Sequence, residues 1–205
     1  MEYIHEERNM LPKTFCQELI EKFESDSRKG EGELQGGHVD TTMKKCIDLK
    51  IESYADWGVE CTRLNDAFYI ASINYLNNLK LNVFGEDKAH IVDELFGGKN
   101  VRKSELLMGR YGVGGQFNWH IDYNRPIDRI CNFIIYLNDH EACTEFLNGK
   151  KIKPEAGKII FFPTTWAHAH CGQPVEKGNK YIITGFIYYE EELTQSLLPF
   201  TVTHD

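Results

Sequence analysis

The residues best suited to chemistry lie in the short segment Trp119-His120-Ile121-Asp122. Successive side chains of a β-strand point to opposite faces, so His120 and Asp122 can face the same way and hold one ion. A neutral imidazole and a carboxylate together suit a divalent transition metal. The segment therefore predicts two ligands of a metal site, and a third ligand must come from elsewhere in the chain.

A second histidine is available further along, in the segment Trp166-Ala167-His168-Ala169-His170. One of its histidines would complete the set of two histidines and one carboxylate that is typical of non-haem Fe(II) centres. His168 and His170 compete for this role, because a spacing of two residues would place both on one strand face. The pair is also similar to the H-x-H of a cupin metal site, but a cupin site would leave His120 and Asp122 unexplained.

Taken together, the motifs resemble Fe(II)/2-oxoglutarate dioxygenases of the prolyl 4-hydroxylase type. In family order over roughly residues 105 to 190, they are His120-x-Asp122, Arg129, Ile135-Tyr136-Leu137-Asn138, Gly157 before an apolar strand, and His170-x-x-x-Pro174-Val175-x-x-Gly178-x-Lys180. One segment departs from the family pattern Gly-Gly-x-Thr-x-Phe, because it contains Thr144 and Phe146 but no glycines: Glu141-Ala142-Cys143-Thr144-Glu145-Phe146. This departure bears on the substrate cleft rather than on the metal.

The resemblance implies that His120, Asp122 and His170 bind Fe(II). His170 is preferred to His168 because the offsets to Pro174-Val175 and Lys180 match the family only when they are counted from His170.

The resemblance also implies the residues that bind the other reactants. Lys180 is expected to neutralise the distal carboxylate of 2-oxoglutarate by a charge-assisted hydrogen bond, and Tyr136, which shares a strand face with Ile134, is expected to donate to the same group. Tyr111 is expected at the mouth of the active site, also as a cofactor-binding residue, and Arg129 near the substrate groove. The alternatives are a strand-edge lysine, a core tyrosine and a surface arginine.

The implied activity is hydroxylation of a prolyl residue in a protein or peptide, with oxidative decarboxylation of 2-oxoglutarate to succinate and CO₂. Fe(II), 2-oxoglutarate and O₂ are the expected cofactors, and L-ascorbic acid is a candidate reductant. A lysyl or free-amino-acid hydroxylase is the nearest alternative, and a non-catalytic, cupin-like metal-binding module is a rival from another class. Nucleic-acid repair dioxygenases end in Arg-x5-Arg, whereas no arginine follows His170.

Composition limits the other possibilities. The chain has 205 residues, a net charge of −8 and scattered basic residues, which disfavours nucleic acid as a partner. Its six cysteines form no C-x-x-C pair, so reduced thiols are expected rather than disulfides or a zinc ribbon. The N-terminus has no apolar signal region and the chain has no apolar run of roughly 20 residues, so we expect a cytoplasmic protein without membrane association. The oligomeric state is open.

The elements that must position these residues follow from periodicity. Helices are predicted at about 13–26 and 55–82, with a glycine-containing loop at 25–40 that is a connector or a lid, and a strand within 41–51. Past Val101, eight short strands are predicted at 106–111, 116–121, 130–137, 145–147, 151–152, 158–162, 168–171 and 181–189. We expect an α+β chain with a mostly β core, a double-stranded β-helix or jelly roll with N-terminal helices packed on one sheet. Residues 1–205 would form a single dioxygenase domain, with a cover at 1–100, a core at 101–190 and a tail at 191–205.

Overall fold

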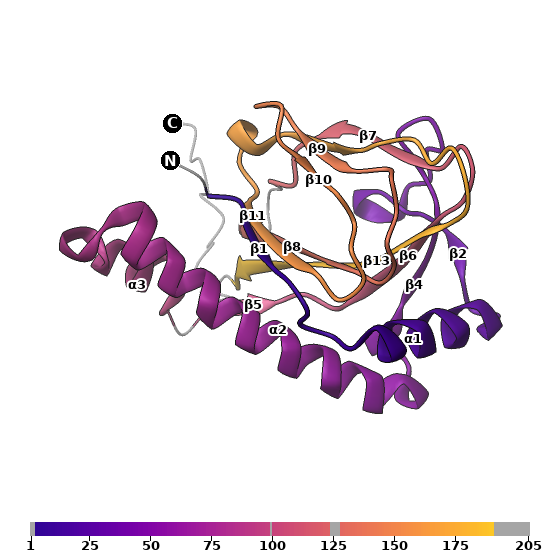
Figure 1. Cartoon of the computed structure of the whole chain (residues 1–205), viewed down its shortest axis with the longest axis horizontal. Helices are drawn as coiled ribbons and strands as arrows, with labels where there is room; N and C mark the ends of the chain where they lie inside the picture. The colour runs from indigo at the N-terminus through magenta and orange to yellow at the C-terminus, as the bar shows by residue number, and fades with distance from the viewer. Residues whose placement is uncertain (1–2, 99, 124–127, 191–205) are drawn as a thin grey trace, which may run out of the picture.

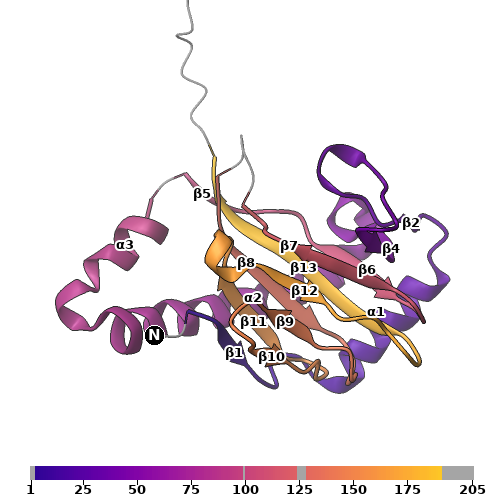
Figure 2. The same ribbon diagram turned by 90° about the horizontal axis from the view of Figure 1, so that it is seen from above.

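The computed structural model describes residues 3–98, 100–123 and 128–190. Two antiparallel sheets face each other, and helices α1 (Lys13–Ser25) and α2 (Gly58–Asn78) lie along the outer face of the larger sheet (Figure 1). Helix α3 (His90–Phe96) extends away from the β body, as Figure 2 shows from above. The predicted fold class, a jelly roll with helices on one sheet, is therefore confirmed. The predicted tail at 191–205 lies outside the described residues.

The larger sheet has the order β1-β11-β8-β13-β6-β4-β2, and β5 pairs with β13 outside this path. Its long central strand β13 forms antiparallel ladders with β8 and β6. The strands are β1 (His5–Glu7), β2 (Gly30–Glu31), β4 (Ile47–Lys50), β5 (Val101–Lys103), β6 (Leu107–Tyr111), β8 (Asp128–Tyr136), β11 (Ile159–Pro163) and β13 (Lys180–Tyr189).

The smaller sheet has the order β10-β9-β12-β7-β3. It supplies the strands on which both candidate histidine ligands lie, β7 and β12. Its members are β3 (Lys44–Lys45), β7 (Gln116–His120), β9 (Thr144–Phe146), β10 (Lys151–Ile152) and β12 (His170–Gly172).

Short helical turns connect these elements. The predicted helix at 55–82 is divided into a 3-10 turn, α2 and a π-helical turn, and the loop at 25–40 contains β2 and one 3-10 turn. The turns are η1 (Gln35–Gly37), η2 (Ile51–Ser53), η3 (Ala55–Trp57), η4 (Leu79–Phe84), η5 (Glu86–Lys88) and η6 (Trp166–His168). In the described part of the chain, no helix is both long enough and apolar enough to cross a bilayer.

Strict alternation along β8 separates the two hydrophobic layers. Phe133 and Ile135 pack toward the helices, where the ring of Phe68 from α2 lies 4.5 Å from that of Phe133, measured between centroids. Ile134 and Tyr136 instead point between the two sheets. The predicted inward orientation of Tyr136 therefore agrees with the structure.

Residues 44–50 cross from one sheet to the other. Strand β3 pairs with β7 of the smaller sheet, and β4 pairs with β6 of the larger sheet. A buried ion pair between Lys44 and Asp48 ties the two strands together. This crossing brings the segment before it, which carries β2 and η1, to the mouth of the cavity between the sheets.

Candidate metal centre

His120 and His170 lie directly opposite each other, because β7 and β12 pair in antiparallel register at these two residues. Nδ1 of His120 lies 2.7 Å from the carbonyl oxygen of Asn118, and Nδ1 of His170 lies 3.2 Å from that of His168. A carbonyl oxygen only accepts, so each Nδ1 donates and each Nε2 keeps its lone pair. Both Nε2 atoms are thus prepared to bind a metal.

Asp122 completes the cluster from just beyond the end of β7. Its Oδ1 lies 3.6 Å from Nε2 of His120 and its Oδ2 lies 3.5 Å from Nε2 of His170. One ligand atom from each of the three residues lies within 4.8 Å of the others. The structure therefore brings the three predicted ligands together, although the strand ends at His120 and Asp122 reaches the site from the loop.

An irregularity in β7 adds an aromatic wall beside His120. Gly172 pairs with Phe117 and His170 with His120, so β7 has one more residue than β12 between the two pairs. Such a bulge changes the face to which the following side chains point. The rings of Phe117 and His120 consequently stack, with centroids 3.6 Å apart.

Burial keeps both imidazoles neutral. Loss of solvent lowers the pKa of His170 to about 4 and also lowers the pKa of His120, and the nearby Asp122 carboxylate only partly opposes these shifts. At neutral pH both rings therefore present an unprotonated Nε2, the form that binds a metal.

His168 does not join the ligand cluster. It ends the 3-10 turn η6, and only His170 lies on β12, so the expectation that both share one strand face is wrong. Its Nδ1 lies 3.1 Å from the hydroxyl oxygen of Thr165. Within the described ranges, the only group of three or more possible metal ligands is the one formed by His120, Asp122 and His170.

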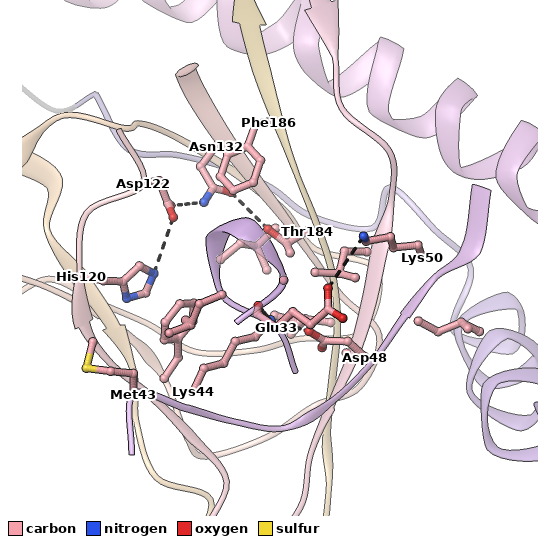
Figure 3. A pocket seen from close by; sticks show the side chains of 18 of the residues that line it. Glu33, Met43, Lys44, Asp48, Lys50, His120, Asp122, Asn132, Thr184 and Phe186 are labelled. Atoms are coloured by element: carbon pink, nitrogen blue, oxygen red, sulfur yellow. Dashed lines mark hydrogen bonds and ion pairs between the residues drawn. The ribbon is translucent and has the colours of Figure 1, made fainter. Parts of the chain in front are cut away.

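The carboxylate of Asp122 is anchored to the larger sheet. Figure 3 shows the side-chain amide of Asn132 pointing at this carboxylate, and its Nδ2 donates to Oδ2 in a short hydrogen bond. The hydroxyl of Thr184 lies 3.4 Å from Oδ1 of Asn132. From the sequence, Asn132 and Thr184 are residues that could face the interior beside the cofactor, because they alternate with core residues on β8 and β13, but the sequence does not predict their contact with Asp122.

A cavity of about 660 Å³ opens beside the three ligands. It runs between the sheets toward the segment that carries β2 and η1 (Figure 3). Side chains of both sheets form its inner wall, among them Tyr111, Phe117, Ile134, Ile182, Thr184 and Phe186.

Lys180 enters the same interior from the start of β13. Ile182 and Thr184 on this strand line the cavity, whereas Tyr181 and Ile183 pack toward the helices. Because side chains alternate along a strand, Lys180 points inward, on the same face as Ile182 and Thr184. It is 2% exposed, and no carboxylate of the described residues pairs with its ammonium, whose hydrogen-bond acceptor is the carbonyl oxygen of Ala142 at 3.3 Å. Burial lowers its pKa to about 8.

The two predicted tyrosines have different surroundings. Tyr111 lies in the cavity wall, and burial raises its pKa. Tyr136 is fully buried and its hydroxyl lies 2.7 Å from that of Thr144, outside the cavity lining. Tyr111 is therefore the better placed of the two to contact a ligand in the cavity.

Arg129 lies in the cavity wall next to the carboxylate ligand. Its guanidinium stacks 3.7 Å from the ring of Phe186, and its Nη1 donates over 3.4 Å to the backbone oxygen of Asp122. Arg110 on β6 instead pairs with Glu24 of α1 at 2.8 Å and does not line the cavity.

Comparisons with known proteins agree on one family. Residues 106–188 match the family model of the 2OG-Fe(II) oxygenase superfamily. A PKHD-type hydroxylase of Synechococcus sp. (strain CC9902) is 31% identical over 108 residues, covering 47% of this chain and 48% of the relative. The alpha-1 subunit of prolyl 4-hydroxylase from Gallus gallus is 29% identical over 105 residues, covering 41% of this chain and 20% of that subunit. The chain thus spans less than half the length of these curated relatives.

Solved structures share the fold. A viral collagen prolyl hydroxylase from Paramecium Bursaria Chlorella virus-1, in its 2OG complex, superposes with a TM-score of 0.60 at 19% identity, covering 93% of this chain and 97% of that one. A prolyl hydroxylase from Trichoplax adhaerens, in complex with a hypoxia inducible factor peptide, superposes with a TM-score of 0.67 at 14% identity, covering 91% and 83%.

Proposed function

Because residues 106–188 form a 2OG-Fe(II) oxygenase domain of the prolyl 4-hydroxylase type, we propose that this protein hydroxylates a prolyl residue in a protein or peptide, using Fe(II), 2-oxoglutarate and O₂. The observation that carries the proposal combines two findings. Three metal ligands, His120, Asp122 and His170, meet in the cavity wall, and Lys180, a buried cation with no carboxylate partner among the described residues, lies against Tyr111 of the same wall. A metal held only for structure would not require such a cation.

The donor set fits Fe(II). His120 and His170 would hold the ion through Nε2 and Asp122 through one carboxylate oxygen, which is the composition of the non-haem facial triad. Three protein ligands leave coordination positions open, as a catalytic site needs and a structural site does not. Bound Fe(II), with 2-oxoglutarate and O₂, supplies the oxidising power that protein side chains lack.

The residues around the cation would bind the 2-oxoglutarate carboxylate that is remote from the metal. Lys180 would hold it by a charge-assisted hydrogen bond in a pocket that contains little water. Gly172, on the facing strand, lies next to this ammonium, since a Cβ atom at that position would be in ordinary contact with Nζ, at 3.5 Å. Tyr111, beneath the lysine, would shape the same end of the cavity.

The substrate would enter from the other side of Asp122. Arg129, flattened against Phe186, would present its guanidinium to a carbonyl or carboxylate of a peptide. The segment that carries β2 and η1 would form the opposite wall, as the lining of the cavity indicates. This arrangement gives the residues at 25–40 a role in substrate contact.

We also propose that the N-terminal cover and the β core act as one domain. The ring of Tyr75 in α2 stacks on that of Phe161 in β11, with centroids 5.1 Å apart, and Phe68 contacts Phe133. Removing residues 1–100 would expose these core aromatics to water.

One assay tests the proposed function. The purified protein is incubated with Fe(II), ascorbate and 2-oxoglutarate, with and without proline-containing peptides, and succinate and peptide mass are measured. We expect succinate formation that depends on Fe(II) and rises with a suitable peptide, which gains the mass of one oxygen atom. An absence of Fe(II)-dependent succinate under all these conditions would contradict the proposal.

A further inference from the structure

We infer that Asn132 is a positioning residue that makes Asp122 bind the metal through a single oxygen, and that Thr184 keeps Asn132 in the required orientation. The inference rests on the proposed function, because it concerns how the same metal site is built. Its starting point is the chain of contacts from Thr184 to Asn132 to Asp122, which is visible in Figure 3.

The two oxygens of Asp122 differ in their hydrogen bonding. Both lie near an imidazole, Oδ1 at 3.6 Å from Nε2 of His120 and Oδ2 at 3.5 Å from Nε2 of His170, but Oδ2 also accepts the hydrogen bond from Nδ2 of Asn132. An oxygen engaged by a buried amide has one lone pair fewer for a metal, so the carboxylate is directed to bind through Oδ1. A carboxylate that binds through one oxygen occupies one coordination position instead of two, which leaves more positions open for the reactants.

The orientation of the amide is itself determined by its neighbours. Asn132 is 3% exposed and lies on β8, so its side chain has little freedom to turn toward solvent. The hydroxyl of Thr184 can donate to Oδ1 of Asn132 at 3.4 Å or to the carbonyl oxygen of Phe133 at 3.2 Å. A donor beside Oδ1 keeps the NH₂ end of the amide directed at Asp122.

A neutral donor suits this position better than a charged one. The amide fixes the carboxylate without cancelling its negative charge, which the metal requires. Arg129 on β8 donates to the backbone oxygen of Asp122 at 3.4 Å and has no hydrogen bond to its carboxylate among the described contacts. The loop is further held by the hydrogen bond from the backbone N–H of Tyr123 to the carbonyl oxygen of Thr164, at 2.9 Å. From β8, Asn132 thus orients the carboxylate of this loop.

The test uses Co(II) as the probe, added anaerobically to the full chain, because its visible absorption reports both affinity and coordination number. In Asn132→Leu we expect Co(II) affinity to fall by about 10- to 100-fold, as is typical when a hydrogen-bond partner of a metal ligand is removed. The spectrum of the saturated variant should change as the carboxylate becomes free to bind through both oxygens. Thr184→Val should lower Co(II) affinity and change the spectrum in the same direction as Asn132→Leu, but to a smaller extent.

A matched control is available in α2. Asn65 also donates its amide to a carboxylate, that of Glu52 at 2.9 Å, but lies outside the cavity lining. Asn65→Leu should lose stability without changing Co(II) affinity or spectrum. If Asn132→Leu fails to fold, Thr184→Val decides the question alone. Unchanged affinity and spectrum in the folded variants would overturn the inference, whereas a wild-type chain that binds no Co(II) would overturn the proposed function.

Discussion

The ammonium of Lys180 lies 5.1 Å from the centre of the Tyr111 ring, and the two residues pair directly across β13 and β6. The lysine therefore meets an aromatic face in the place where a buried cation usually meets a carboxylate. This arrangement leaves the charge available to an incoming anion, which 2-oxoglutarate would provide.

Replacing Lys180 should weaken 2-oxoglutarate binding specifically. Loss of a charged partner in a buried pocket typically costs about 2–4 kcal/mol, so Lys180→Ala should lower the affinity roughly 30- to 1,000-fold. Iron binding should be nearly unchanged, because the three metal ligands are separate residues. The anaerobic metal-to-ligand charge-transfer band measures the affinity, and an unchanged value would assign the carboxylate to another cation, with Arg129 the first candidate.

The affinity for 2-oxoglutarate should also depend on pH. Burial lowers the pKa of Lys180 to about 8, and the facing groups Cys46, Cys143, Cys171 and Tyr111 stay neutral because burial raises their pKa values. The charged lysine binds the anion, so affinity should be fully present below about pH 8 and fall as the pH rises through that value. The same titration on Lys180→Arg, whose side chain stays charged, should be flat over this range.

Arg129 should affect the peptide and not the co-substrate. If its guanidinium bonds a peptide oxygen, Arg129→Met should raise the KM for the peptide by about 10- to 100-fold, the equivalent of one charge-assisted hydrogen bond. Succinate formed without peptide should change little. Arg110→Met is the matched control, because Arg110 pairs with Glu24 away from the cavity. An increase in the KM for 2-oxoglutarate in Arg129→Met would contradict this assignment.

The choice of distal metal ligand can be settled by two single variants. His170→Ala should lose stoichiometric metal, whereas His168→Ala should retain it, because His170 has its Nε2 beside Asp122 and His168 is not part of the ligand cluster. Metal content is measured after anaerobic loading with Fe(II), and circular dichroism verifies the fold. The opposite result would identify His168 as the distal ligand. Catalytic activity that persists in Asp122→Ala would rule out the triad.

The turn before β11 should be sensitive to a single methyl group. Gly157 has φ +83°, and a Cβ atom there would lie 2.2 Å from the carbonyl oxygen of Leu11. Gly157→Ala should lower the free energy of unfolding by at least about 3 kcal/mol, of which roughly 1–2 kcal/mol is backbone strain. Gly149 has φ +86°, but a Cβ atom there would have no neighbour within 4 Å. Gly149→Ala should therefore lower the free energy of unfolding only by the cost of backbone strain. Urea unfolding of both variants measures the difference, and equal losses would show that the Leu11 contact adjusts.

Local patterns were enough to predict much of the sheet and the identity of the residues that meet. The alternation in β8 and β13 separates a helix-facing side from an inward side, and short turns between strands indicate the jelly roll. His120, Asp122 and His170 were found because metal ligands are chemically distinctive residue types and their order along the chain matches a known family. These signals need only neighbouring residues or the order of motifs along the chain, and both can be read from one sequence.

The features that the sequence did not predict depend on contacts between distant segments. Asp122 lies beyond the strand end, and Phe117 shares a face with His120 only because of the bulge opposite β12. Strand β1, His5–Glu7, has no apolar alternation and becomes a strand by pairing with β11. Asn132 is one polar residue in an apolar strand, and its role is visible only when Asp122 is beside it.

The metal site is connected to both sheets, since both histidines belong to the smaller sheet and Asn132 ties the carboxylate of Asp122 to the larger one. One ion would therefore join the two halves of the sandwich. Thermodynamic linkage then requires reciprocity: whatever free energy the ion contributes to holding the sheets together, the closed sheets contribute to holding the ion. Any partner that alters the separation of the sheets, including a peptide in the cavity, would change the metal affinity without contacting the metal-binding side chains.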